Sequence, residues 1–231
     1  MRLLAIETAT EACTVALWVD GAVGERFELA PRRHAELVLP MADALLAEAG
    51  VGKRQLDAIA VGRGPGAFTG IRLAIAIAQG LALALDRPVV PVSTLAVLAQ
   101  GGAGHGLPVL ALVDARMGEV YAGAFDIAAD GLVVPRGAES VSAPQDVAAP
   151  AARFAGVGTG FGAHGGALGA RFGSALAQVA PDALPRAADL ARLAARDLAA
   201  GLGVDALDAQ PVYLRDKVAL TLAEQGKPMP T

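Results

Sequence analysis

Apolar residues cluster most clearly between residues 56 and 92. Residues 56–61 form a short apolar run bounded by polar residues and glycine, which is typical of a buried strand. After a glycine-rich stretch, residues 71–85 are rich in Ala, Leu and Ile and contain no proline, which predicts a helix that ends at Asp86. Residues 89–92 return to a strand pattern. The stretch therefore predicts a βαβ unit with two parallel strands.

The predicted helix is apolar on more than one side. A helix that lies on a sheet needs one apolar stripe, yet Gln79 is nearly the only polar residue between Arg72 and Asp86. At about 25 Å, the helix is too short and too rich in Ala and Gly to indicate a membrane span. Its second apolar side needs another protein surface, either other helices of this chain or, as we favour, a partner subunit. Candidate contacts are Leu73, Ile77, Gly80, Leu81 and Ala84, and Gly80 with Ala76 and Ala84 has the spacing that lets another helix approach closely.

The glycine-rich loop before this helix allows two interpretations. Its glycines can adopt backbone angles that other residues avoid, and Thr69 is a candidate N-cap. Free N–H groups at a helix start can hold a phosphate or carboxylate. The alternative, which we favour, is a tight turn without a nucleotide, because no Gly-Lys-Ser/Thr of a Walker A motif follows and Arg72 is the nearby cation. A partner docking at the loop stays open. The candidate anion contacts are Gly64, Gly66, Thr69 and Gly70.

Three antiparallel strands are predicted before the βαβ unit. Residues 3–6 and 13–19 have strand patterns, and Asp20-Gly21 is a hairpin turn signal that leads into residues 23–29. A helix is predicted over residues 35–49, and Pro40 inside it predicts a kink or an early first turn. The apolar positions of this helix are Leu37, Val38, Met41, Leu45 and Leu46.

The second half of the chain repeats the opening pattern. Residues 110–114 parallel residues 3–7, since both are apolar strands that end in an acid, and a second strand and an Asp-Gly turn follow each. A glycine-rich linker lies between the halves. We expect two related α/β domains at residues 1–102 and 103–223, and a mobile tail at 224–231. Later elements are predicted as a strand at 153–158, helices at 168–179 and 188–200, and an extended segment at 211–215.

Composition narrows the class of protein. No signal peptide is recognisable, and the single cysteine, Cys13, fits a reducing cytoplasm. The formal net charge is −4, with acidic and basic residues interspersed, whereas a protein that grips nucleic acid unaided carries a basic surface. Any role with nucleic acid therefore needs the charge of a partner.

Catalytic and metal-binding patterns are weak. The three histidines, His34, His105 and His164, are scattered without ligand spacing, so we predict no metal site. The glycine-rich run at 156–162 lacks the spacing of a dinucleotide fingerprint and is interpreted as a loop. Cys13 lies in a predicted strand with no anchored base. We predict no catalytic residue in this chain.

Three stretches carry a family resemblance: residues 62–72, 113–122 and 211–215, supported by the opening Ile6-Glu7-Thr8-Ala9-Thr10. In these stretches the chain resembles the TsaB (YeaZ) family, a subunit of the bacterial machinery for threonylcarbamoyladenosine (t6A) in tRNA. The resemblance implies the duplicated ASKHA fold of actin, Hsp70 and sugar kinases, an α/β fold of two ribonuclease H-like subdomains with mixed sheets. That fold agrees with the internal repeat.

Comparison with the catalytic paralogue TsaD implies an eroded active site. TsaD carries a His-x-x-x-His metal pair at the positions of Thr94 and Leu98, neither of which is a good metal ligand. The turn that begins at Glu7 lacks glycine, and the turn from Asp114 to Gly118 lacks the Gly-Gly-His-Thr type of run. Arg116 is a further candidate anion contact, or else a partner in a surface salt bridge. We favour structural roles for Glu7 and Asp114 over association with a metal.

The resemblance implies a non-catalytic scaffold subunit that is not an enzyme on its own. It would pair with TsaD, and through the complex with the ATPase TsaE, so that threonylcarbamoyl passes from threonylcarbamoyl-AMP to the adenosine 3′ of the anticodon. ATP and metal are implied for the partners, with no cofactor held by this chain, and tRNA would be contacted indirectly. By analogy the contact is a helical bundle, in which Leu37, Met41 and Leu45 join the contacts on the second helix. Without its partner the chain would form a homodimer.

Two other functions stay open. An ATP-dependent kinase of the same fold would need intact phosphate-binding hairpins and a catalytic Asp. A metallopeptidase, an older label for the superfamily, would need bound zinc or iron.

Overall fold

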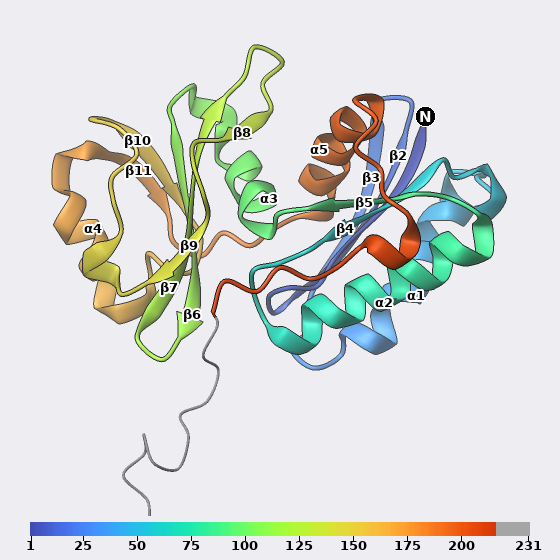
Figure 1. Ribbon diagram of the computed structural model, residues 1–231, viewed down its shortest axis with the longest axis horizontal. Coiled ribbons are helices and arrows are strands. Elements are labelled where there is room, and N and C mark those ends of the chain that lie inside the picture. The colour runs from blue at the N-terminus through green and yellow to red at the C-terminus, as the bar shows by residue number, and fades with distance from the viewer. Residues whose placement is uncertain (216–231) are drawn as a thin grey trace, which may run out of the picture.

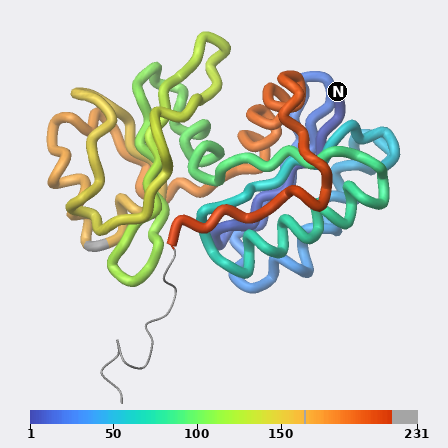
Figure 2. Tube along the Cα trace, in the orientation of Figure 1, coloured from blue at the N-terminus to red at the C-terminus, as the bar shows by residue number. Residues whose placement is uncertain are grey.

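The computed structural model describes residues 1–215 and contains two lobes, each built on one β-sheet (Figures 1 and 2). The first sheet has five strands in the order β3-β2-β1-β4-β5. Its first three strands form an antiparallel meander, and β4 and β5 extend it in parallel from β1. The meander and the βαβ unit are thus confirmed. The strands are β1 (Arg2–Glu7), β2 (Ala12–Val19), β3 (Ala22–Leu29), β4 (Ala58–Gly62) and β5 (Val89–Val92).

Helices cover both faces of the first sheet. Helices α1 (His34–Glu48) and α2 (Phe68–Leu85) pack on one face, where side chains such as Ile6, Ile59 and Ile71 are buried. Helix α5 (Ala187–Ala199) packs on the other face against β1 and β2. Burial of these apolar side chains, at about 25 cal/mol per Å², is the main term that holds the lobe together.

The second sheet repeats the arrangement of the first. Its order is β11-β10-β6-β7-β8, with β9 also paired to β7; β6 and β7 are antiparallel, whereas β10 and β11 add in parallel. Helix α4 (Ala167–Phe172) covers its outer face. Two mixed sheets with this duplicated order confirm the predicted fold class. The strands are β6 (Val109–Arg116), β7 (Glu119–Ile127), β8 (Val133–Pro135), β9 (Ser140–Ser142), β10 (Phe154–Val157) and β11 (Leu176–Ala180).

Helices α3 (Thr94–Gly101) and α5 lie between the two sheets (Figure 1). Their buried residues belong to one apolar cluster that also includes Ala60 and Val90 of the first sheet and Val109 and Phe125 of the second. The lobes therefore share a continuous core. Short 3₁₀ segments complete the fold: Lys53–Gln55, Ala103–His105, Pro144–Asp146, Ala163–Gly166, Gly173–Ala175 and η6 (Ala206–Asp208).

Two local predictions need correction. The helix predicted over 168–179 is wrong, because α4 ends at Phe172 and residues 176–180 form β11 instead. Gly173 has a φ of +50°, which stops the helix and which a residue with a side chain rarely adopts. The early first turn that Pro40 suggested is also absent: α1 continues through Pro40 as one helix.

The division at residues 102 and 103 stays a prediction. Helix α5 belongs to the second half of the chain but covers the first sheet, so the chain returns to its first lobe. From η6 the segment 211–215 runs back toward the second lobe, and the N–H of Val212 donates to the carbonyl of Arg63. The predicted tail at 224–231 lies outside the described residues, as do residues 216–223.

Among the described residues, α2 is the one helix that is long and apolar enough to suit a membrane span, with a mean hydropathy of 1.7 over its 18 residues. Such a helix is weak evidence for a membrane, since apolar helices of soluble proteins have the same properties. Here Ala74, Ile75 and Ala78 are buried against the sheet, and α2 packs on β4 and η6. We therefore interpret α2 as a surface helix of the first lobe.

Candidate functional site

The glycine-rich loop packs directly on the turn between β1 and β2. A Cβ atom at Gly70 would lie 2.0 Å from the carbonyl oxygen of Thr8, and one at Gly66 would lie 2.4 Å from that of Ala9. Hydrogen bonds hold this approach: the Thr8 hydroxyl donates to the Gly70 carbonyl (2.7 Å), and the Ala67 N–H donates to the Ala9 carbonyl (2.7 Å). The space beside these glycines is filled by the chain itself, which favours the turn over an anion cradle.

Gly64 and Thr69, the other two predicted anion contacts of the loop, do not pack on the turn at Thr8 and Ala9. Gly64 has a φ of +89°, and a Cβ there would lie 2.7 Å from a methyl carbon of Ile71. Thr69 is not the N-cap, because it is already the second residue of α2, which begins at Phe68. Ala67 takes the cap position and its carbonyl accepts the first helical bond, from the Ile71 N–H (3.0 Å). Thr69 lies exposed in the first turn.

Glu7 is a fully buried carboxyl at the end of β1. Its Oε1 accepts the Ala9 N–H (2.7 Å), and its Oε2 accepts the Thr94 hydroxyl (2.9 Å). Gly62 leaves room for it, since a Cβ there would overlap Oε2 at 1.9 Å. Burial raises the pKa of Glu7 to about 7, although the hydrogen bonds from Ala9 and Thr94 act in the opposite direction. Glu7 thus connects three segments of the first lobe, in keeping with a structural role.

The positions that match the metal pair of the paralogue have no metal-binding arrangement. The Thr94 hydroxyl is engaged with Glu7, and Leu98 is buried in the shared core. His34 lies in α1 with Nε2 3.0 Å from the Thr10 carbonyl, and His105 is exposed in a 3₁₀ turn. Among the side chains that the structure describes, which do not include that of His164, no three His, Cys, Asp or Glu residues lie close enough together to hold a metal ion.

A cleft of about 1160 Å³ opens between the lobes. Its walls come from the turns after β1 and β6, the loops before α1 and α2, and the segment 212–215. Four arginines line it, against the carboxylates of Glu11 and Asp114. The sequence did not reveal this convergence, because the lining residues come from segments far apart in the chain. The arginines are Arg32, Arg72, Arg116 and Arg215.

Arg116 is the last residue of β6 and pairs with Asp114. Its backbone N–H donates to Asp114 Oδ1 (2.8 Å) and its Nη1 donates to Oδ2 (3.0 Å). This contact matches the salt-bridge interpretation. The Arg116 side chain is nonetheless largely exposed at the cleft, and surface ion pairs of this kind contribute only about 0–1 kcal/mol. Its guanidinium is therefore free to exchange Asp114 for an anionic ligand.

The outer surface of α2 carries small and aliphatic side chains. Ala76, Gly80 and Ala84 are exposed, and a Cβ at Gly80 would meet nothing within 4 Å. Leu73, Ile77 and Leu81 flank this stripe and are partly buried. We call these six residues the α2 surface. Two further exposed leucines, Leu39 of α1 and Leu83 of α2, were missed because they fall outside the helical spacing used for the prediction.

One predicted contact residue does not reach the surface. Leu45 is 5% exposed and belongs to the core under α1, where it packs beside Gly24. Because α1 turns this side chain toward the sheet, Leu45 stabilises the lobe and offers little surface to a partner. Leu37 and Met41 are only partly buried and lie on the same helix.

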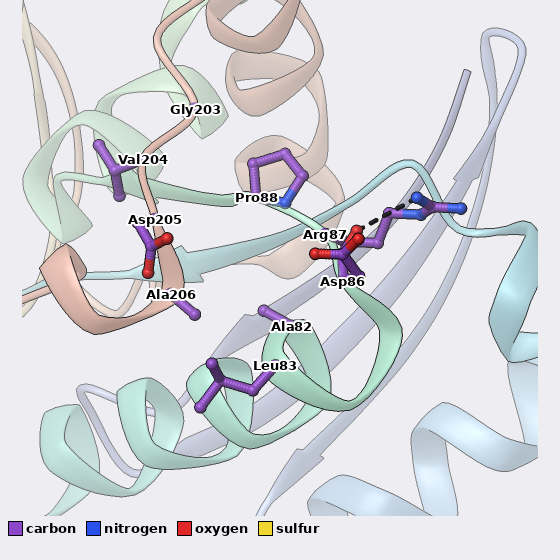
Figure 3. Close-up of a pocket in the computed structure, with 9 residues that line it drawn as sticks. All are labelled: Ala82, Leu83, Asp86, Arg87, Pro88, Gly203, Val204, Asp205 and Ala206. Atoms are coloured by element: carbon purple, nitrogen blue, oxygen red, sulfur yellow. Dashed lines mark hydrogen bonds between the residues drawn. The ribbon is translucent and has the colours of Figure 1, made fainter.

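A second, smaller pocket of about 330 Å³ lies at the end of α2 (Figure 3). Asp86 ends the helix there with a left-handed backbone, and Arg87 Nη1 donates to the Asp86 carbonyl (3.2 Å). Residues 203–206 form the opposite side. Leu83, which is 56% exposed, extends the apolar surface of α2 to this pocket.

Comparisons with known proteins point to one family. The family model for TsaD, tRNA N6-adenosine threonylcarbamoyltransferase, matches residues 27–222. The tRNA threonylcarbamoyladenosine biosynthesis protein TsaB of Escherichia coli K12 is 44% identical over 225 residues, which cover 95% of this chain and 96% of that protein.

Solved structures from Pseudomonas aeruginosa agree. YeaZ has a TM-score of 0.83 at 44% identity and covers 92% of this chain and 99% of its own. An uncharacterized protein with similarity to peptidase YEAZ has a TM-score of 0.85 at 46% identity, and the match covers 93% of this chain and 99% of that protein. With near-complete coverage in both sequence and structure, this chain belongs to the TsaB (YeaZ) family.

Proposed function

We propose that this chain is a non-catalytic subunit of the t6A synthase, which binds and stabilises a TsaD-type catalytic subunit. Family membership supports a role in the biosynthesis of t6A in tRNA. The finer assignment, as a scaffold, depends on the surface that the chain presents and on the state of its former active site.

The observation that carries the proposal is the α2 surface. A helix whose exposed side is made of Ala76, Gly80 and Ala84 lets another helix approach closely, and the flanking Leu73 and Ile77 supply apolar area to bury. Met41 and Leu37 of α1 lie on the same face of the sheet and extend this area. Two helices from each subunit would then pack as a four-helix interface. In the absence of the partner, the same surface would form a homodimer.

The assignment as non-catalytic rests on two positions. Where TsaD would hold its metal, Thr94 is a hydrogen-bond donor to Glu7 and Leu98 is a core residue. In this proposal the TsaD-type subunit supplies the metal and transfers threonylcarbamoyl from threonylcarbamoyl-AMP to the adenosine 3′ of the anticodon. A TsaE-type ATPase joins through the complex, and the assembly works in the cytoplasm.

Co-expression with the TsaD-type paralogue of the same genome tests the proposal. The wild-type chain should co-elute with the paralogue in size-exclusion chromatography. Gly80→Leu should abolish co-elution, because the added side chain has room in the free chain but blocks a close helix–helix contact. Ile77→Asp is a less selective variant, since Ile77 also packs on the core of its own lobe.

Gly169→Leu is the matched control. Gly169 also lies in a helix, α4, and a Cβ there would meet nothing within 4 Å. This variant should co-elute like the wild type. Unimpaired binding by Gly80→Leu would show that the partner does not dock on α2.

A further inference from the structure

Two exposed aromatic rings lie beside an arginine in the lining of the cleft between the lobes. The guanidinium carbon of Arg72 lies 3.2 Å from the ring centroid of Phe68 and 4.9 Å from that of Tyr213. The two rings are 6.1 Å apart and inclined by 32°. Phe68 is 57% exposed and Tyr213 is 46% exposed, so the rings are not core residues. We call these three residues the Arg72 cluster.

Main-chain contacts fix the two segments that carry the Arg72 cluster. Phe68 and Arg72 are one turn apart at the start of α2, beside the glycine loop that packs on Thr8 and Ala9. Tyr213 follows Val212, whose N–H donates to the Arg63 carbonyl (2.9 Å). Two residues later, Arg215 donates to the Ala115 carbonyl (3.1 Å) and pairs with Glu119 of the second lobe. The rings are therefore held in place before any ligand binds.

The surroundings are more basic than the rest of this acidic chain. Four arginines and two carboxylates line the cleft, although the formal net charge of the whole chain is −4. Arg116 pairs with Asp114 and Arg215 with Glu119, whereas Arg32 and Arg72 form no ion pair with any residue between 1 and 215. The positive potential is thus concentrated where the aromatic rings are exposed.

Exposed aromatic rings beside arginines match the chemistry of single-stranded nucleic acid. Unpaired bases stack on aromatic and guanidinium planes, and arginines neutralise the adjacent phosphates. A free nucleotide fits less well, because the space beside Gly66 and Gly70, where a phosphate could meet backbone N–H groups, is filled by the turn at Thr8 and Ala9. The two rings line the cleft and are exposed, so an extended strand can reach them.

We propose that the Arg72 cluster binds single-stranded RNA, with bases stacked on Phe68 and Tyr213 and with phosphates held by Arg32 and Arg116. The inference rests on the proposed function, in which the RNA is the anticodon loop of a tRNA that reads ANN codons. It assigns this chain a direct contact with the RNA, beyond its role as a scaffold.

Fluorescence anisotropy with a labelled anticodon stem-loop tests the inference. The stem-loop is titrated with the full chain and with its complex with the TsaD-type paralogue. Phe68→Ala and Tyr213→Ala should each weaken binding by about tenfold, in line with the loss of one stacked base. Arg32→Gln should weaken binding and should reduce, by about one, the magnitude of the slope in a plot of the logarithm of the binding constant against the logarithm of the salt concentration, because one phosphate contact is lost.

The matched control is Phe27→Ala. Phe27 is also exposed and lies beside an arginine, Arg186, 4.8 Å from its ring centroid, but it belongs to β3 and does not line the cleft. Its RNA affinity should equal that of the wild type. Thermal unfolding of each variant verifies that the fold is intact, as expected for exposed positions.

Three outcomes would overturn the inference: unchanged affinity of both aromatic variants, an equal loss in Phe27→Ala, or no RNA binding by either the chain or the complex. If free ATP displaces the stem-loop when both are at the same concentration, the inference is also wrong, because the ligand of the cluster is then a small nucleotide and not RNA. Co-elution with the paralogue is measured separately and tests only the scaffold assignment. If the variants bind RNA as the wild type does, the scaffold assignment still stands. If the chain does not co-elute with the paralogue, the RNA titration of the chain alone still tests the RNA contact.

Discussion

The Thr94 hydroxyl donates a hydrogen bond of 2.9 Å to the Glu7 carboxyl, and neither residue is exposed to solvent. The bond joins the end of β1 to the first turn of α3, the helix that leads from the first lobe to the second. A buried acid at this point makes the stability of the fold depend on pH.

Stability should decrease as the pH rises from about 4.5 to about 7. Burial raises the pKa of Glu7 from 4.5 to about 7, so the folded chain holds the proton more tightly than the unfolded chain. Its favourable contribution is complete below pH 4.5 and is lost as the pH rises through 7. At about 1.4 kcal/mol per pKa unit, the difference is about 3 kcal/mol. Urea unfolding at pH 5 and pH 8 should show this decrease in the wild type and a much smaller one in Glu7→Gln. Equal decreases in both proteins would exclude Glu7 as the cause.

Thr94→Val should destabilise the fold by about 1–3 kcal/mol, because it removes the donor to Glu7 Oε2 and leaves a buried acceptor without a partner. The loss should be larger at pH 8 than at pH 5, since the ionised carboxylate depends more on the donor. Thr69→Val is the control. Thr69 is exposed, so the free energy of unfolding of that variant should stay close to the wild-type value. A loss that is the same at both pH values would argue against coupling to the charge of Glu7.

Gly70→Ala should prevent folding or cost more than about 3 kcal/mol. The new Cβ would lie 2.0 Å from the Thr8 carbonyl oxygen, and backbone atoms on both sides cannot move without breaking the loop. Gly80→Ala in the same helix should instead stabilise the chain by about 0.5–1 kcal/mol, because the position is open and Ala favours helix. Thermal unfolding of both variants measures the contrast, and similar melting temperatures would contradict it.

Leu45→Ala should lower the free energy of unfolding by about 2–5 kcal/mol, since Leu45 is a core residue of the first lobe. Leu83→Ser should change stability little, because Leu83 is exposed, but should weaken co-elution with the TsaD-type paralogue. Chemical denaturation and size-exclusion chromatography separate the two effects. Full binding by Leu83→Ser would limit the docking surface to the central part of α2.

The sequence was sufficient for elements whose apolar pattern is local. The meander, the βαβ unit and the second apolar side of α2 follow from the spacing of residues within single elements. Leu45 was misplaced because α1 is apolar on two sides, and spacing alone does not tell which side meets the sheet. Helix α2 begins at Phe68, earlier than the sequence predicted, because the hydrogen bond between Ala67 and Ala9, which are distant in the chain, fixes the loop before the helix. The Arg72 cluster depends on Tyr213, which only the return of the chain to its first lobe brings to α2.

The apolar core that α3 and α5 share with both sheets also has a mechanical consequence. Hinge-like opening of the lobes, of the kind that kinases of related architecture use to admit and release nucleotide, would expose Val109, Phe125 and their neighbours to water. The shared core therefore opposes a change in the angle between the lobes. In the proposed assembly, the partner and the RNA would therefore meet surfaces that the shared core keeps at a nearly constant separation.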